Sequence, residues 1–152
     1  DNVWNVVPQP GGSVTVDGKQ YPYLFWEGIG SNEIKWDFSE SFCVAGNDSQ
    51  QFLEMISQTF ALNDKEKTDF ITYWLAELQQ NPYSLVSFPL QQYEQQARLQ
   101  ISPEPSQLIR IFMVFRRVHK STQTTAPSLP AITRDANSFH VVEWGGMNLD
   151  KR

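Results

Sequence analysis

The sequence predicts an α+β fold, in which a mainly antiparallel sheet or β-sandwich is interrupted by a two-helix excursion in the middle of the chain. Strand-favouring residues gather near the two ends, and apolar residues at helical spacing lie between residues 48 and 80. An apolar run from Leu108 to Phe115, interrupted only by Arg110, is typical of a strand covered on both faces. Because strands and helices are segregated along the chain, α+β fits better than an alternating α/β order.

Length and composition restrict the possible classes of protein. The chain has 152 residues, of which 40% are hydrophobic and 13% aromatic, so residues 1–152 are expected to form a single domain with a real core. The net charge of −5 argues against a general affinity for nucleic acid. No run of about 18 apolar residues occurs, so no membrane span is expected.

A hairpin is the first predicted element. Two β-favouring runs, Ser13–Val16 and Tyr21–Trp26, flank an Asp17-Gly18 pair, and a tight hairpin turn needs the positive φ that this pair allows. Pro22 has no N–H to donate, so the second strand is expected to begin there or to lie at a sheet edge.

Two helices come next. Asp48 is a candidate cap for the first, which extends to Phe60, and Asn63 with Glu66 forms a capping box for a second helix over 64–80. The second helix carries an apolar stripe expected to cover one side of the sheet, made of Phe70, Ile71, Trp74, Leu75 and Leu78. We therefore expect Trp74 to be buried.

The last part of the chain returns to strands. In order, the sequence predicts a strand at Tyr83–Phe88, a short helical stretch at 90–97, the central strand at 108–115, a long polar surface loop or crossing connection at 119–137, and a last strand at 139–144 that stops at Gly145-Gly146.

The residues that bind metals or cofactors are scarce. Cys43 is the only cysteine, so no intrachain disulfide is possible, and we expect it to be a small buried side chain. His119 and His140 are the only histidines and show no metal-binding spacing. No glycine loop of the phosphate-binding kind is present, so neither a metal nor a cofactor is expected.

Four blocks of sequence stand out together: YPYLFWEG at 21–28, DFITYWL at 69–75, NPY at 81–83 and VVEWGG at 141–146. As a set they resemble an uncharacterised family of secreted or surface-anchored bacterial proteins, over the chain from about Trp4 to Gly146. The resemblance implies an extracellular or cell-surface location and further strands before the point where this chain begins. It brings no activity with it.

Two pairs of neighbouring residues are the candidate ligand-binding residues: Trp26-Glu27 and Glu143-Trp144. Two carboxylates flanking a sugar suit glycoside hydrolysis, and indole faces suit stacking against sugar rings. The plainer interpretation is that each Trp faces the core and each Glu faces solvent. On that interpretation, Glu27→Gln and Glu143→Gln leave the fold intact.

A basic cluster comes after the predicted central strand and contains Arg116, Arg117, His119 and Lys120. It could bind a phosphate or an acidic partner. The favoured interpretation is a solvated strand end that protects an apolar run from aggregation.

Three functions stay open. The first is a non-enzymatic binding or structural module of a secreted or cell-surface assembly, which associates through strand edges with an identical copy or with another protein. The second is a carbohydrate-binding or carbohydrate-active protein that uses the two Trp-Glu pairs, with a glycan as its partner. The third is an enzyme with another kind of site, although no catalytic signature is present.

Overall fold

The computed structural model describes residues 3–28, 34–135 and 137–151. They form two compact units, Asp1–Ile34 and Lys35–Arg152. That residues 1–152 form a single domain stays a prediction. The α+β class is confirmed: the described residues form two sheets, mostly antiparallel, and three α-helices.

The first unit holds a three-stranded antiparallel sheet of β1 (Val6–Pro8), β2 (Val14–Val16) and β3 (Lys19–Tyr21). The predicted hairpin turn is confirmed, since Asp17 and Gly18 have φ angles of 49° and 75°. The predicted second strand lies at a sheet edge, as expected, but a start at Pro22 is wrong, because β3 ends before this residue. The two-residue turn pairs Val16 with Lys19, so β2 already ends opposite Tyr21. Pro22 follows the last paired residue and has no N–H with which to extend the strand.

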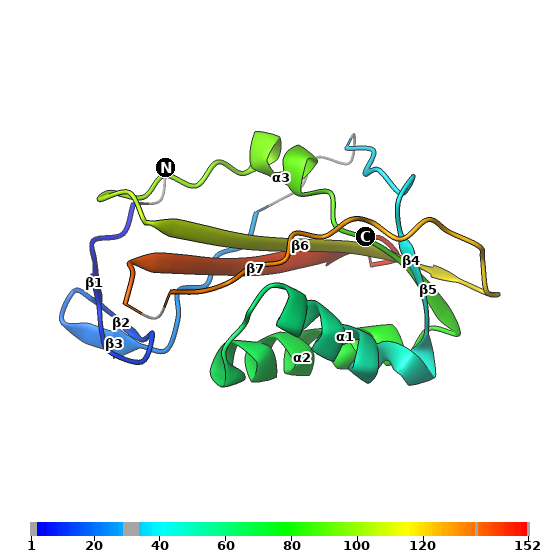
Figure 1. Ribbon diagram of the computed structural model, residues 1–152, viewed down its shortest axis with the longest axis horizontal. Helices are drawn as coiled ribbons and strands as arrows, with labels where there is room; N and C mark the ends of the chain where they lie inside the picture. Colours follow the sequence, from blue (N-terminus) through cyan, green and yellow to red (C-terminus); the bar gives the residue numbers. More distant parts are fainter. Residues whose placement is uncertain (1–2, 29–33, 136, 152) are drawn as a thin grey trace. The chain divides into compact units, whose positions relative to one another are not determined.

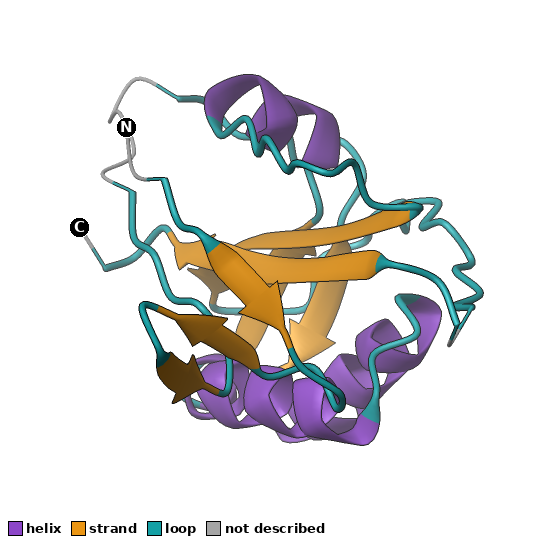
Figure 2. Ribbon diagram, turned by 90° about the vertical axis from the view of Figure 1, so that its left-hand side faces the viewer, coloured by secondary structure: helices purple, strands orange, loops and turns teal. Residues whose placement is uncertain are grey.

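The second unit is a four-stranded sheet with helices on both faces (Figures 1 and 2). Its elements are, in order, β4 (Phe42–Ala45), the 3-10 helix η1 (Gly46–Asp48), α1 (Ser49–Thr59), α2 (Asp64–Gln79), β5 (Tyr83–Ser87), α3 (Leu90–Gln96), β6 (Gln107–Val118) and β7 (His140–Asn148). The strand order is β4-β5-β6-β7, and the predicted two-helix excursion lies between β4 and β5. Helices α1 and α2 cover one face, and α3 lies over the other (Figure 1).

The buried side chains confirm two predictions, the central strand and the apolar stripe on the second helix. β6 lies between β5 and β7, and its side chains alternate between the faces. On one face Ile111 and Phe115 are fully buried against α1 and α2, and on the other Phe112 and Val114 form a smaller cluster with Tyr93 of α3. The capping box at the start of α2 is present, with both of its hydrogen bonds formed.

The last strand is longer than predicted, and it is the parallel member of a mostly antiparallel sheet. β7 pairs with β6 in parallel, so the polar segment after β6 must travel the length of the sheet before β7 can begin. The described residues between 119 and 139, which make this crossing, contain no helix or strand and only one isolated bridge. Moreover, β7 does not stop at Gly145-Gly146 but continues through both glycines to Asn148.

The strand tolerates these glycines because one of them makes room for a helix. A Cβ at Gly146 would lie 2.2 Å from the carbonyl oxygen of Met113 and 2.9 Å from Cζ2 of Trp74, whereas a Cβ at Gly145 would meet only Phe112 at 3.9 Å. Gly146 therefore lets the Trp74 indole of α2 pack directly on the sheet.

We expect Gly146→Ala to destabilise the protein by about 1 to 3 kcal/mol, the usual cost of overpacking a core, and by more if the backbone oxygen cannot shift. Gly145→Ala is the matched control and should change the free energy of unfolding by about 0.5 kcal/mol or less. Chemical denaturation of both variants checks this. Equal losses would contradict the packing role of Gly146.

Strand β4 is not among the predicted elements, since Phe42–Ala45 is too short to show a period. Cys43 on this strand is half-buried instead of fully buried. Its Sγ accepts a hydrogen bond from the N–H of Thr122 at 3.3 Å.

Candidate functional site

Trp26 and Glu27 belong to the first unit, in the irregular segment after β3. Trp26 is 41% exposed, and its neighbours Tyr23 and Phe25 are 55% and 64% exposed. Glu27 is exposed as well. The plain interpretation, in which Trp faces the core, is therefore wrong for Trp26.

Glu143 lies on β7 of the second unit, opposite Arg110 of β6 in the parallel register. Its Oε2 accepts from Nε of Arg110 at 2.6 Å, and its Oε1 accepts from the Tyr93 hydroxyl at 2.6 Å and from Nη2 of Arg110 at 3.3 Å. Only 13% of the Glu143 side chain is exposed. Both carboxylate oxygens are thus engaged inside the protein, and Glu143 does not face solvent as the plain interpretation expects.

Trp144 packs on the core from the other face of β7. Its ring lies edge-on to Phe70 at 5.5 Å and to Tyr73 at 5.8 Å, both on α2. Trp144 and Glu143 therefore point to opposite faces of the sheet, as successive strand residues do. The pair cannot present an indole and a carboxylate to one sugar ring.

Around Arg110, the α3 face of the sheet holds a buried polar cluster. The guanidinium donates to the carbonyl of Ala97 at 2.9 Å and lies 4.5 Å from the centre of the Tyr93 ring. Tyr93 in turn stacks on Phe112 with 3.9 Å between ring centres. Burial disfavours the charge on Arg110, but the hydrogen bond and charge of Glu143 outweigh it and raise the pKa of Arg110.

Tyr93 gives a pH-dependent prediction. Burial, followed by the hydrogen bond to Glu143 and its charge, raises the pKa of Tyr93 above its ordinary value of 10.0. Above about pH 10 the unfolded chain loses this proton while the folded protein keeps it, so the free energy of unfolding falls as the pH rises.

We expect Tyr93→Phe to remove this alkaline loss of stability, because phenylalanine has no proton to release. Unfolding by denaturant at pH 8 and at pH 11 measures it in both proteins. An identical pH slope for the variant and the wild type would contradict the assignment.

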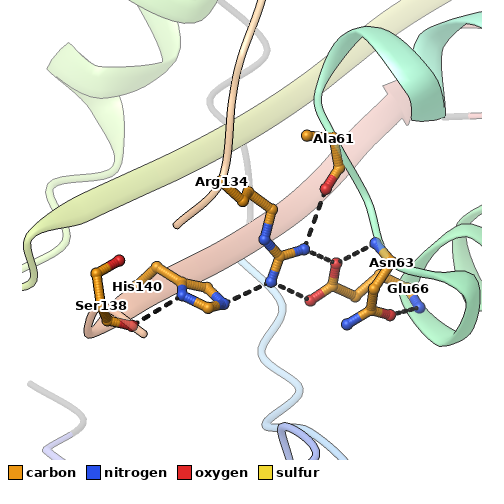
Figure 3. A network of polar contacts seen from close by, with 6 residues as sticks. All are labelled: Ala61, Asn63, Glu66, Arg134, Ser138 and His140. Atoms are coloured by element: carbon orange, nitrogen blue, oxygen red, sulfur yellow. Dashed lines mark hydrogen bonds and ion pairs between the residues drawn. The ribbon is translucent and has the colours of Figure 1, made fainter. Parts of the chain in front are cut away.

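A second polar cluster fixes the beginning of β7 (Figure 3). Arg134 pairs with Glu66 at the first turn of α2 at 2.5 Å and donates to the carbonyl of Ala61 at 3.1 Å. Nη2 of Arg134 lies 2.6 Å from Nε2 of His140, whose Nδ1 lies 3.0 Å from the carbonyl of Ser138. Since arginine can only donate, Nε2 accepts and Nδ1 carries the proton. The cluster ties β7 and the connection before it to α2.

The two edges of the four-stranded sheet differ. β4 has four residues, and the chain just before it is covered: Glu40 forms a bridge with Thr125, and Ser41 donates its N–H to the Thr125 carbonyl at 2.8 Å. β7 has nine residues, and within the described part of the chain no strand pairs with its outer edge. Within the described residues, β7 therefore presents the longer unpaired edge.

The basic cluster is divided between faces of the sheet. Arg116 and Arg117 are neighbours on β6 and are both exposed, so their side chains point to opposite faces. The guanidinium of Arg116 lies 5.0 Å from the centre of the Phe38 ring. His119 and Lys120 come after the strand and are exposed.

Comparisons with known proteins give no match to a family model, a curated protein or a solved structure. The resemblance to bacterial surface proteins stays a prediction. In the described ranges, no helix is both long and apolar enough to cross a membrane. Nor do those ranges contain a group of three or more His, Cys, Asp or Glu side chains suited to a metal ion.

The sequence did not reveal the Arg110–Glu143–Tyr93 cluster. One signal was present: a lone arginine inside an apolar strand must find a counter-charge if that strand is buried. The partner itself could not be identified, because the register between β6 and β7 is set by the tertiary fold.

Proposed function

We propose that this protein is a non-enzymatic binding or structural module of a secreted or cell-surface assembly, and that it associates with another protein chain through the outer edge of β7. The observation that carries the proposal is the length of this unpaired edge, nine residues in a sheet of four strands. Unpaired N–H and C=O groups along an edge strand are a template for a further strand.

β7 lacks several of the features that often protect an edge, since it is not short and carries neither lysine nor proline. Natural edge strands avoid pairing by being short, by carrying lysine or proline, or by being covered. β7 contains neither residue, and its one acidic side chain, Glu143, is neutralised by Arg110. β4 shows the contrast, since it is short and its approach is covered by the segment around Thr125.

A second copy of the chain is the simplest occupant of this edge. Two β7 strands related by a two-fold axis would pair antiparallel, each supplying the same surface. The anchoring of His140 by Arg134 holds the beginning of the strand against α2, so the edge is presented in a fixed position. The secreted or cell-surface setting rests on the sequence resemblance alone.

Light scattering at micromolar concentration tests the proposal. We expect a mass of about twice 17.5 kDa for the wild type. Gly145→Lys should shift it to the monomer, since position 145 has space for a side chain and lysine is a common guard of exposed edges.

Gly145→Ala is the control, which adds a side chain without charge and should keep the wild-type mass. A wild type of 17.5 kDa at these concentrations would contradict the proposal. So would an unchanged mass for a folded Gly145→Lys variant.

A glycan-binding role is the second candidate, favoured by the exposed aromatic residues Tyr23, Phe25 and Trp26 beside Glu27. Aromatic faces stack on sugar rings while a neighbouring carboxylate accepts from sugar hydroxyls. It no longer includes Glu143 and Trp144, which are engaged within the second unit. A glycan array tests it: a signal that Trp26→Ala abolishes would support this role, and a blank array would end it.

A further inference from the structure

A cavity of about 440 Å³ opens on the second unit, between the end of β6 and the segment that covers the approach to β4. Phe38, Leu85 and Arg116 line one part of it, and hydroxyl side chains such as Ser41 and Thr124 line another. This volume lies in the range of small-molecule sites. None of the lining residues belongs to β7, so a ligand in this cavity is independent of the proposed association.

Arg116 supplies the charge. It stands beside Leu85 in the β5–β6 register, and its guanidinium lies over the Phe38 ring, 5.0 Å from the ring centre. In the part of the chain that the structure describes, Arg116 forms no ion pair, in contrast to Arg110 and Arg134. Its charge is therefore available to a ligand.

Hydroxyl groups line the same cavity. Ser41 is 1% exposed as a residue, yet it lines the cavity, and its hydroxyl makes no hydrogen bond to any other described residue. Ser39 and Thr124 add further hydroxyls along the wall. Hydroxyl donors beside a guanidinium are suited to the oxygens of a carboxylate or phosphate, which arginine can bind through two parallel N–H groups.

The wall that carries Thr124 is held in place from both sides. The N–H of Ser41 donates to the Thr125 carbonyl at 2.8 Å, and the N–H of Thr122 donates to Sγ of Cys43 at 3.3 Å. The hydroxyl wall is therefore anchored to β4 and to the residues just before it, instead of lying free in solvent. The apolar rings and chains of Phe38 and Leu85 form a second surface next to the charge.

We propose that this cavity binds a small organic anion, in which one carboxylate or phosphate group pairs with Arg116 and an adjacent apolar group lies against Phe38 and Leu85. The hydroxyls of Ser41 and Thr124 donate to the remaining oxygens of the anion. Of the two arginines in the basic cluster, Arg116 then binds the anion, whereas Arg117 lies on the opposite face of the sheet and does not.

Titration calorimetry with phenyl phosphate and with benzoate tests the proposal and shows which oxyanion is preferred. We expect saturable binding of at least one of them to the wild type, and none of benzyl alcohol, which has the ring without the charge. Arg116→Gln should weaken binding at least about tenfold, as loss of a charged hydrogen-bonding group does. Arg117→Gln is the matched control and should bind as the wild type does.

Ser41→Ala is a second variant, which removes a single hydroxyl from the lining, and should weaken binding severalfold. Thermal unfolding establishes that each variant is folded before it is titrated. The proposal is overturned if the wild type binds neither anion, if benzyl alcohol binds as well as they do, or if both arginine variants lose affinity equally.

Discussion

Trp74→Ala is expected to destabilise the protein by about 3 to 5 kcal/mol, the range found when large aromatic side chains are truncated in cores. Trp74 is 4% exposed and lies edge-on to Phe115 of the central strand with 5.8 Å between ring centres. Removing it leaves a cavity at the point where α2 meets the sheet. Denaturant unfolding of the purified variant measures the loss.

A second variant, Trp74→Phe, separates the packing of the ring from the effect of the indole N–H. The indole Nε1 is buried without a hydrogen-bond partner among the described residues, and such a group costs about 1 to 3 kcal/mol. Phenylalanine retains most of the packing and removes that cost, so we expect it to lose less than half as much stability as alanine. A melting temperature near that of the wild type for Trp74→Ala would contradict the core position of this residue.

Glu143→Gln is expected to cost about 3 to 5 kcal/mol, because it leaves the buried Arg110 without its counter-charge. This revises the sequence-based expectation that the exchange leaves the fold intact. Only 7% of the Arg110 side chain is exposed, so water cannot replace the lost partner. Unfolding by denaturant at neutral pH measures the effect.

Two further variants isolate the cause. Glu27→Gln makes the same change at an exposed position and should stay within about 0.5 kcal/mol of the wild type. The double variant Arg110→Met/Glu143→Met removes both charges and should recover much of the stability, as apolar replacements of buried ion pairs do. If Glu143→Gln and Glu27→Gln behave alike, the buried ion pair has no structural role.

The parts of the fold that could be predicted are those with local causes. The Asp17-Gly18 turn and the Asn63–Glu66 capping box depend on residues only a few positions apart, and both are confirmed. The apolar stripe of α2 and the apolar run of β6, which only Arg110 interrupts, predict burial without any knowledge of their neighbours.

The rest depends on contacts between distant residues. The parallel pairing of β6 with β7 places Arg110 beside Glu143, 33 positions later, and no local pattern specifies that register. A Gly-Gly pair in the sequence usually indicates the end of a strand. Gly146 nevertheless lies inside β7, because a side chain at this position would collide with the indole of Trp74 on α2. Of the candidate site, the sequence identified Glu143 but not its partners, and it identified the basic cluster but not the division between its two arginines.

The parallel pairing also has a consequence for the order of folding. Strands β4, β5 and β6 pair antiparallel, and α1 and α2 pack against each other, so all of these contacts can form from residues up to Val118. β7 can dock only after the chain between β6 and β7 has crossed the unit, and closing such a loop is slow. Until then, β6 is itself an edge strand with apolar residues on both faces. We therefore expect the docking of β7 to be the late step of folding, and the chain to be most prone to aggregate just before it.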